Sequence, residues 1–244
     1  MKTPEFRRRF YRDWIYPRDL CRKRVVVRET DLEILSDKTI DEKFITSRIE
    51  KYRLQIELYI IKDKRFLTAL KPLAVELTAP RIVQEMAIQS RKANVGPMAS
   101  VAGAIAEFVG KDLIRKGSKT VIIENGGDIF MKIARPVKVG LFAGRTKLLS
   151  KLKIKIKPQE TSLGICASSG TIGHSLSFGC ADCVVIIAKS ATLADAVATA
   201  TANLVQTGAD LSPAIQFARS IKGVRAAVII LKNNLASWGK IEFI

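Results

Sequence analysis

Histidine, cysteine and long apolar segments are all scarce in this sequence. Its 244 residues include one histidine and four cysteines. The cysteines are too few and too unevenly spaced for a disulfide scaffold, which predicts a reducing compartment, the cytoplasm. No apolar run approaches the roughly 18 residues needed to cross a bilayer. The arginine-rich start has no apolar stretch, so a secretory signal and a membrane span are not expected.

Acidic residues are also few, and the excess positive charge is unevenly placed. Lys and Arg number 41 against 23 Asp and Glu, a net charge of +18. Residues 1–28 hold ten basic and three acidic side chains, and we expect residues 1–23 to form a basic arm. Residues 145–157 hold six basic and no acidic side chains. Such surfaces attract nucleic acid, anionic lipid or a polyanionic cofactor, or serve only solubility.

Hydrophobic periodicity and turn signals predict a mixture of helices and strands. Helices are expected over residues 40–62, 78–91, 99–115, 193–205 and 213–221. Strands are expected over residues 24–30, 32–37, 120–124, 129–133, 137–143, 152–156, 164–167, 183–188 and 225–231. No regular βαβ rhythm is present, which favours an α+β fold, and the length fits a single domain spanning residues 1–244.

Two of the predicted strands have distinctive patterns. Residues 151–157 alternate lysine with leucine or isoleucine, which indicates one wet face and favours a lysine-protected sheet edge. Residues 183–188 are almost continuously apolar, which indicates burial on both faces.

Residues 125–128, of sequence Asn-Gly-Gly-Asp, separate two predicted strands. Glycines there let a ligand approach the backbone closely, and exposed N–H groups can receive a phosphate. Asn-Gly is also the strongest short signal for a β-hairpin turn. Taken alone, the tetrapeptide favours the hairpin.

Residues 168–175 follow a strand and contain His174, the one histidine. Hydroxyl groups, flexible backbone and an imidazole suit anion binding or proton transfer. A lone histidine beside glycine is more often structural, so this segment is suggestive only.

On the helix predicted over residues 193–205, Asp195 and Thr199 are i,i+4 neighbours on one face. Their oxygens suit a hard cation such as Mg²⁺, which takes few protein ligands. The alternative is helix capping, with Thr192 or Asp195 in the first turn.

A Cys-x-x-Cys pair, Cys180 and Cys183, invites a redox or a zinc interpretation. Zinc would need further ligands, for which Cys166 and His174 are the nearby candidates. Structural cysteines at the start of a buried strand are the favoured interpretation.

Four segments resemble, in order along the chain, the motifs of one family. Residues 103–107 look like its Gly-Ala-Ile-Ala-Lys segment, and residues 125–129 like its Asn-Ala-Gly-Gly-Asp-Ile turn. His174 falls where the family has its histidine, and residues 194–200 are similar to its Ala-Asp-Ala-Leu-Ala-Thr-Ala helix. The chain thus resembles the ApbE superfamily, typically Mg²⁺-dependent FAD:protein FMN transferases. The resemblance implies mixed, mostly antiparallel sheets flanked by helices.

The superfamily implies roles for particular residues of this chain. The implied Mg²⁺ ligands are the Ala104 carbonyl, the Asp195 carboxylate and the Thr199 hydroxyl. The implied contacts to FAD or FMN are Glu107, in place of the family's lysine, Asn125, Gly126, Gly127 and Asp128.

In the implied reaction, a threonine of an acceptor protein attacks the FAD pyrophosphate and AMP leaves. Mg²⁺ would neutralise charge on the phosphoryl oxygens, and His174 or Asp182 would take the hydroxyl proton. The implied partners are a flavin nucleotide and an acceptor protein, and a homo-oligomer is compatible with this role.

Over its whole length the chain looks closer still to an uncharacterised ApbE-like subfamily of archaea and bacteria. Its hallmarks resemble residues 28–32 and 173–182. That resemblance implies an alternative function as a non-flavin accessory protein of anaerobic sulfide assimilation and homocysteine formation. Cys166, Cys180 and Cys183 would then handle persulfide sulfur.

A third function is nucleic-acid binding by the basic arm, where aromatic residues interleave with arginine as stacking surfaces do. No recognised nucleic-acid motif occurs in the sequence, so nucleic acid is the least favoured partner.

Overall fold

The fold is known from a computed structural model, which describes residues 19–140, 153–168 and 179–244. His174 and most of the predicted basic arm therefore lie outside the described residues. Residues 21–23, which the sequence assigned to that arm, belong instead to the first strand.

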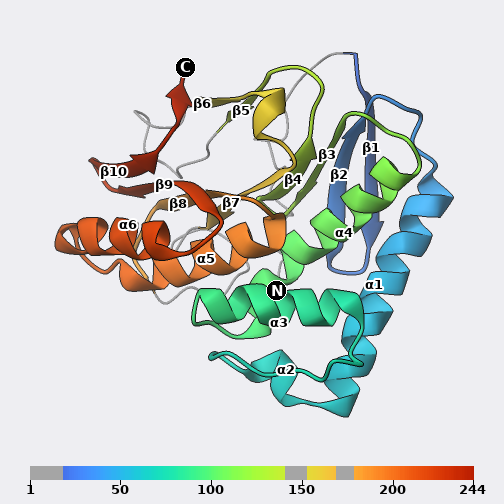
Figure 1. Ribbon diagram of the computed structural model, residues 1–244, viewed down its shortest axis with the longest axis horizontal. Helices are drawn as coiled ribbons and strands as arrows, with labels where there is room; N and C mark the ends of the chain where they lie inside the picture. Colours follow the sequence, from blue (N-terminus) through green and yellow to red (C-terminus); the bar gives the residue numbers. More distant parts are fainter. Residues whose placement is uncertain (1–18, 141–152, 169–178) are drawn as a thin grey trace, which may run out of the picture.

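Eight strands form one sheet in the order β1-β2-β3-β4-β7-β8-β9-β10, and every neighbouring pair is antiparallel (Figure 1). Their bounds are β1 Cys21–Val27, β2 Thr30–Ser36, β3 Val121–Asn125, β4 Asp128–Lys132, β7 Leu163–Ser168, β8 Cys183–Ala188, β9 Val224–Leu231 and β10 Asn234–Gly239. A second antiparallel sheet has the order β11-β6-β5. Its strands are β5 Val137–Gly140, β6 Lys153–Ile156 and β11 Glu242–Phe243.

The helices lie on one side of the large sheet, some against its face and others packed outside those, and the small sheet lies against the other face (Figure 1). They are α1 Glu42–Lys62, α2 Arg65–Thr68, α3 Arg81–Lys92, α4 Val101–Arg115, α5 Ala191–Leu204 and α6 Leu211–Ser220. Short 3-10 turns occupy Pro97–Ser100, Pro158–Glu160 and Gly208–Asp210. Among the described residues, no helix is both long and apolar enough to cross a bilayer.

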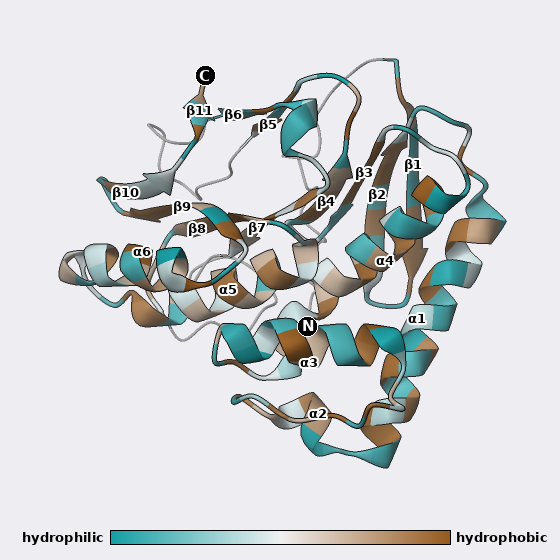
Figure 2. Ribbon diagram, in the orientation of Figure 1, coloured by the Kyte–Doolittle hydropathy of each residue, from teal (hydrophilic) through white to brown (hydrophobic). Residues whose placement is uncertain are grey.

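The core follows from where apolar side chains fall on these elements. Two apolar clusters fill the space between the helices and the large sheet, and a third lies between the two sheets. Consistent with this, β8 and β9 are brown almost throughout in Figure 2. Helix α5 is rich in alanine and buried on nearly all sides, as expected of a helix without a polar face. Its small side chains let it lie at the centre of the helical layer.

The α+β fold is confirmed, as is the burial of β8 on both faces. The lysine-protected edge is wrong, because β6 pairs with β5 on one side and β11 on the other. The solvent-facing side predicted for this strand is confirmed, since Ile154 and Ile156 are buried and Lys153 is exposed. The sequence also missed β10, whose side chains are mostly exposed and carry no apolar alternation.

Two boundaries differ from the predictions for local reasons. The first hairpin turns at Arg28 and Glu29, because Val27 pairs with Thr30. Arg28 adopts a positive φ of 52° there. Helix α3 begins at Arg81 with Pro80 as its N-cap, rather than with Thr78.

Candidate functional site

A row of three polar side chains crosses the centre of the large sheet. The register pairs Asn125 of β3 with Asp128 of β4, and Asp128 with Cys166 of β7. Directly paired residues project to the same face of a sheet, and here that face carries α4 and α5. Gly126 and Gly127 connect the strands with φ of 70° and 107°. Positive φ at both positions is the type I′ hairpin geometry, so the hairpin predicted at 125–128 is confirmed.

Two helices cover this row. The Asn125 side-chain amide donates to the carbonyl oxygen of Ala102, at the start of α4, over 3.0 Å. Asp195, in the second turn of α5, accepts a 2.9 Å hydrogen bond on Oδ2 from the backbone N–H of Gly103. A Cβ at Gly103 would lie 2.4 Å from the carbonyl oxygen of Ala191 and 2.9 Å from the Asp195 Cβ. Glycine is therefore needed where α4 and α5 meet.

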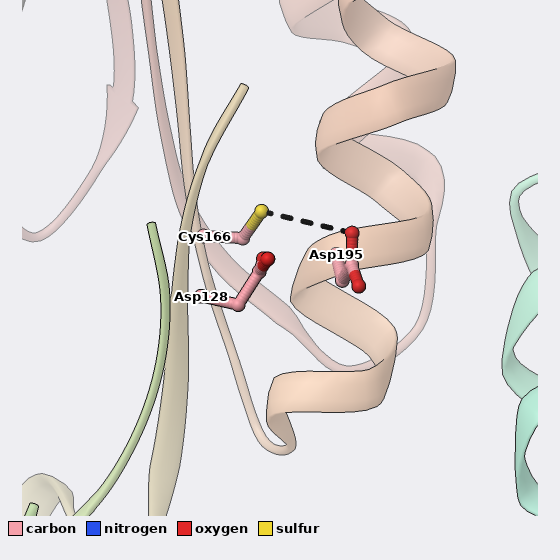
Figure 3. A group of neighbouring side chains, drawn as sticks. All are labelled: Asp128, Cys166 and Asp195. Atoms are coloured by element: carbon pink, nitrogen blue, oxygen red, sulfur yellow. Dashed lines mark hydrogen bonds between the residues drawn. The ribbon is translucent and has the colours of Figure 1, made fainter. Parts of the chain in front are cut away.

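Asp128, Cys166 and Asp195 consequently converge in a buried group, and Figure 3 shows them pointing towards one another. Their exposed fractions are 7%, 3% and 9%, and their ligand atoms all lie within 4.8 Å of one another. The Cys166 Sγ lies 4.0 Å from the Asp195 Oδ1. Among the described residues, the buried Asp128 Oδ1 has no hydrogen-bond partner.

Burial shifts the protonation of this group in one direction. It raises the pKa of Asp128 to about 7 and that of Asp195 well above its usual range. The Asp128 charge raises the pKa of Asp195 further, whereas the backbone N–H groups of Gly103 and Ala102 oppose the shift. Burial, with the two carboxylates, also raises the pKa of the Cys166 thiol. Burial therefore favours the protonated form of each of the three groups, and a bound cation would favour the charged form instead.

Glu107 lies at the N-terminus of α5 rather than in this group. Its Oε2 accepts from the backbone N–H of Thr192 over 3.1 Å and from the Thr192 hydroxyl over 3.0 Å. Its Oε1 lies 2.6 Å from the Lys111 Nζ, and the side chain is 2% exposed. The N-cap of α5 is Ser190, so the predicted capping by Thr192 or Asp195 is wrong in detail. Asp195 instead accepts a hydrogen bond from the backbone N–H of Gly103, in the first turn of α4.

The other predicted site residues are placed as follows. Ala104 is buried in the first turn of α4, and Thr199 is half-buried one turn beyond Asp195 on α5. Asp182 precedes β8 and accepts from the backbone N–H of Lys232 in the β9–β10 turn. Cys166 pairs with Ile186 of β8, and Asp182 comes four residues before Ile186. In extended chain this separates Asp182 from Ile186, and so from the Cys166 position, by about 13 Å. His174 is outside the described residues.

The four cysteines do not form a common site. Cys166 belongs to the apolar cluster on the helix side, whereas Cys183 belongs to the cluster between the sheets. Cys180 and Cys21 are exposed, and the Cys180 Sγ lies 3.3 Å from the Gln206 Oε1. A structural role is thus supported for Cys183 but not for Cys180. The sequence did not connect Cys166 with Asp128 and Asp195, because only the pairing of β4 with β7 brings them together.

The sequence matches the protein family described as AbpE bacteria over residues 12–236. The chain belongs to this family. A UPF0280 protein of Methanocaldococcus jannaschii is 41% identical to this ApbE-like chain over 226 residues, covering 90% of it and 91% of the relative. A UPF0280 protein of Methanospirillum hungatei is 41% identical over 215 residues, covering 88% and 86%. The predicted ApbE-like subfamily is therefore confirmed.

Solved structures support the same fold for this ApbE-like chain. The flavinyl transferase ApbE of Pseudomonas stutzeri superposes with a TM-score of 0.60 at 13% identity, over 90% of this chain and 93% of that one. The flavin transferase ApbE of Vibrio cholerae gives 0.56 at 13% identity, over 91% and 97%. At such identity the likeness shows the fold, and the ApbE-like architecture predicted from the motifs is confirmed.

The ApbE-like chain has donors suited to a cation near Asp195. The Asp195 Oδ2 is fixed by the Gly103 N–H, which leaves Oδ1 directed towards the sheet. The Asp128 Oδ1, buried and without a partner among the described residues, is a second available oxygen. Carboxylate and hydroxyl oxygens are ligands that Mg²⁺ accepts, so these residues fit a divalent cation.

Proposed function

We propose that this ApbE-like chain binds a flavin nucleotide, FAD or FMN, together with Mg²⁺ and acts in the cytoplasm as an FAD:protein FMN transferase. One observation carries the proposal. The buried carboxyl groups of Asp128 and Asp195 converge beside a Gly-Gly turn and the first turn of α4, where a cation would offset their combined charge. The sequence motifs, and the fact that the solved neighbours are flavin transferases, support a flavin as the nucleotide.

The Asn125–Asp128 turn is the proposed entry for the nucleotide. Among the described residues, no atom lies within 4 Å of where a Cβ at Gly126 would stand, so none of them blocks a ligand from approaching the backbone there. Gly126, Gly127 and Asp128 would line the nucleotide. Asn125 and Glu107 hold α4 and α5 through Ala102 and Thr192, and we assign them positioning roles.

The Asp195 carboxylate, the Thr199 hydroxyl and the Ala104 carbonyl would hold Mg²⁺, which when bound neutralises negative charge on phosphate oxygens. Gly103 fixes the orientation of Asp195 through its N–H. The proposed base for the acceptor's threonine hydroxyl is His174. Asp182, the other candidate, is engaged by the N–H of Lys232, and we assign it to that turn.

The test is isothermal calorimetry of the purified full chain with FAD, with and without Mg²⁺. Asp195→Asn should abolish the Mg²⁺-dependent part of the binding, because the amide cannot carry the negative charge. Asp112→Asn is the matched control, since Asp112 is equally buried but bonds the Tyr52 hydroxyl 2.7 Å away. Mass spectrometry of an added acceptor protein and detection of released AMP would establish transfer. Wild-type protein that binds neither FAD nor FMN under any condition would refute the proposal.

The accessory role in sulfide assimilation has less support from the placement of the thiols. Cys166 and Cys183 face opposite sides of the sheet, and only Cys180 of the three is exposed. Sulfide-dependent growth that survives serine replacement of all three would exclude cysteine-based sulfur handling.

A further inference from the structure

We propose that Asp128, Cys166 and Asp195 form a binding site for a borderline-soft divalent cation of the Zn²⁺ class. The inference rests on the proposed function through two shared residues, because Asp195 serves both cation sites and Asp128 also lines the proposed nucleotide site. Binding of the cation itself needs no flavin.

The geometry is close to that of a cation site. The three side chains come from β4, β7 and α5, and their ligand atoms lie within 4.8 Å of one another. Sulfur and oxygen ligands of a tetrahedral Zn²⁺ lie about 3.5 Å apart, given typical Zn–S and Zn–O lengths. The Cys166 Sγ is 4.0 Å from the Asp195 Oδ1. Small side-chain rotations are therefore enough to close the site.

The unsatisfied oxygen of Asp128 is an independent indication of a ligand. Asp128 is 7% exposed, and among the described residues its Oδ1 has no hydrogen-bond partner. Figure 3 shows its carboxyl group directed at Cys166 and Asp195. A buried polar atom without a partner is costly, and coordination to a cation would satisfy it. The Gly103 N–H meanwhile orients Asp195, as outer contacts commonly orient metal ligands.

The sulfur decides the class of cation. Mg²⁺ strongly prefers oxygen ligands, whereas thiolate favours Zn²⁺ and related transition metals. Coordination deprotonates a thiol outright, so binding would release the Cys166 proton together with any proton held by the two carboxyl groups. Three protein ligands leave one position open for water or a phosphate oxygen of a nucleotide.

The test adds Co²⁺, a spectroscopic substitute for Zn²⁺, to chelator-treated, flavin-free full-length protein. Wild-type protein should bind one ion per chain with a near-ultraviolet thiolate-to-cobalt charge-transfer band. Zn²⁺ should displace the Co²⁺, and equimolar Mg²⁺ should not. Cys166→Ser should remove the band and weaken Co²⁺ binding by at least about tenfold, since losing a direct ligand exceeds losing an outer contact.

One further variant is the control for location, and another tests the Asp128 ligand. Cys183→Ser changes an equally buried thiol on the other face of the sheet and should leave the band intact. Asp128→Asn, which keeps the side-chain shape, should weaken Co²⁺ binding while circular dichroism shows the fold unchanged.

The outcomes separate this inference from the proposed function. The inference is overturned if wild-type protein shows no band, or if the band survives Cys166→Ser. The three side chains would then form a buried group that does not bind the cation together. Thr199→Ala should keep the Co²⁺ band but lower Mg²⁺-dependent FAD binding, since Thr199 lies outside the sulfur-containing set. Protein that shows the band but never binds a flavin supports this inference and refutes the flavin function. Mg²⁺-dependent FAD binding without any band supports the flavin function and refutes this inference.

Discussion

The carboxylate of Asp195 accepts a hydrogen bond from the backbone N–H of Gly103 at 2.9 Å, which joins the second turn of α5 to the first turn of α4. The N–H groups at the start of a helix have no partner within it, and a carboxylate is favoured there. The Asp195 side chain thus satisfies one N–H group in the first turn of α4 with one oxygen, and its second oxygen faces Cys166. Asp195 therefore has both a structural role, in joining two helices, and a place in the candidate site.

Gly103→Ala tests how close this helix contact is. The new Cβ would lie 2.4 Å from the carbonyl oxygen of Ala191, so α4 and α5 must separate. We expect the free energy of unfolding, measured with urea, to fall by about 1–3 kcal/mol. Gly208→Ala is the matched control, because the one described atom within 4 Å of its Cβ would be the Asn234 amide nitrogen, at 3.8 Å. Equal effects at the two sites would contradict the tight contact at Gly103.

Asp128 should make stability depend on pH when no metal is present. Its pKa in the folded chain is raised to about 7, so between its ordinary pKa and 7 the folded state holds a proton that the unfolded state has lost. Stability from this group is therefore present at low pH and is lost as pH rises towards 7, by up to about 1.4 kcal/mol per pH unit. Relative to Asp128→Asn, wild-type protein in chelator should be about 1–2 kcal/mol less stable at pH 7 than at pH 5. Urea unfolding at the two values measures this, and an unchanged difference between the two proteins would contradict it.

Glu107→Gln should affect stability more than flavin affinity. The change weakens the hydrogen bonds from Thr192 and the ion pair with Lys111. A loss of about 1–2 kcal/mol is expected because hydrogen bonds to a charged group are replaced by neutral ones. Thermal unfolding and FAD titration measure the two effects. Lys111→Met, which removes only the half-exposed partner, should cost less than about 1 kcal/mol. A variant of wild-type stability with weakened FAD binding would show instead that Glu107 contacts the flavin.

Thiol reactivity should divide the four cysteines into two pairs. Cys21 and Cys180 are exposed, whereas Cys166 and Cys183 are buried. Burial raises the pKa of Cys183 to about 12 and that of Cys166 well above its usual range, so both remain poorly reactive thiols. Ellman's reagent should detect two fast thiols in the native chain and four after denaturation. Rapid modification of Cys166 in the native chain would show that the Asp128–Cys166–Asp195 group is open to solvent.

Sequence patterns determined the local elements and the family of this protein. The Asn-Gly-Gly-Asp turn was predictable because two successive positive φ angles favour glycine at positions 126 and 127. The apolar run of β8 predicted burial on both faces, and the spacing of Asp195 and Thr199 predicted that they lie on one side of a helix. These features depend on neighbours within a few residues, so they can be read from the chain itself.

Tertiary structure alone decided which of these residues meet. Cys166 lies beside Asp128 because β7 pairs with β4 in one register, and Asp195 lies above them because Gly103 lets α5 pack against α4. Those contacts arise from the packing of whole elements, and a shift of one residue in the register would turn Cys166 to the opposite face. The same packing placed Glu107 against the N-terminus of α5 and Asp182 against the β9–β10 turn. Sequence thus supplied the candidate groups, and long-range packing determined which of them share a site.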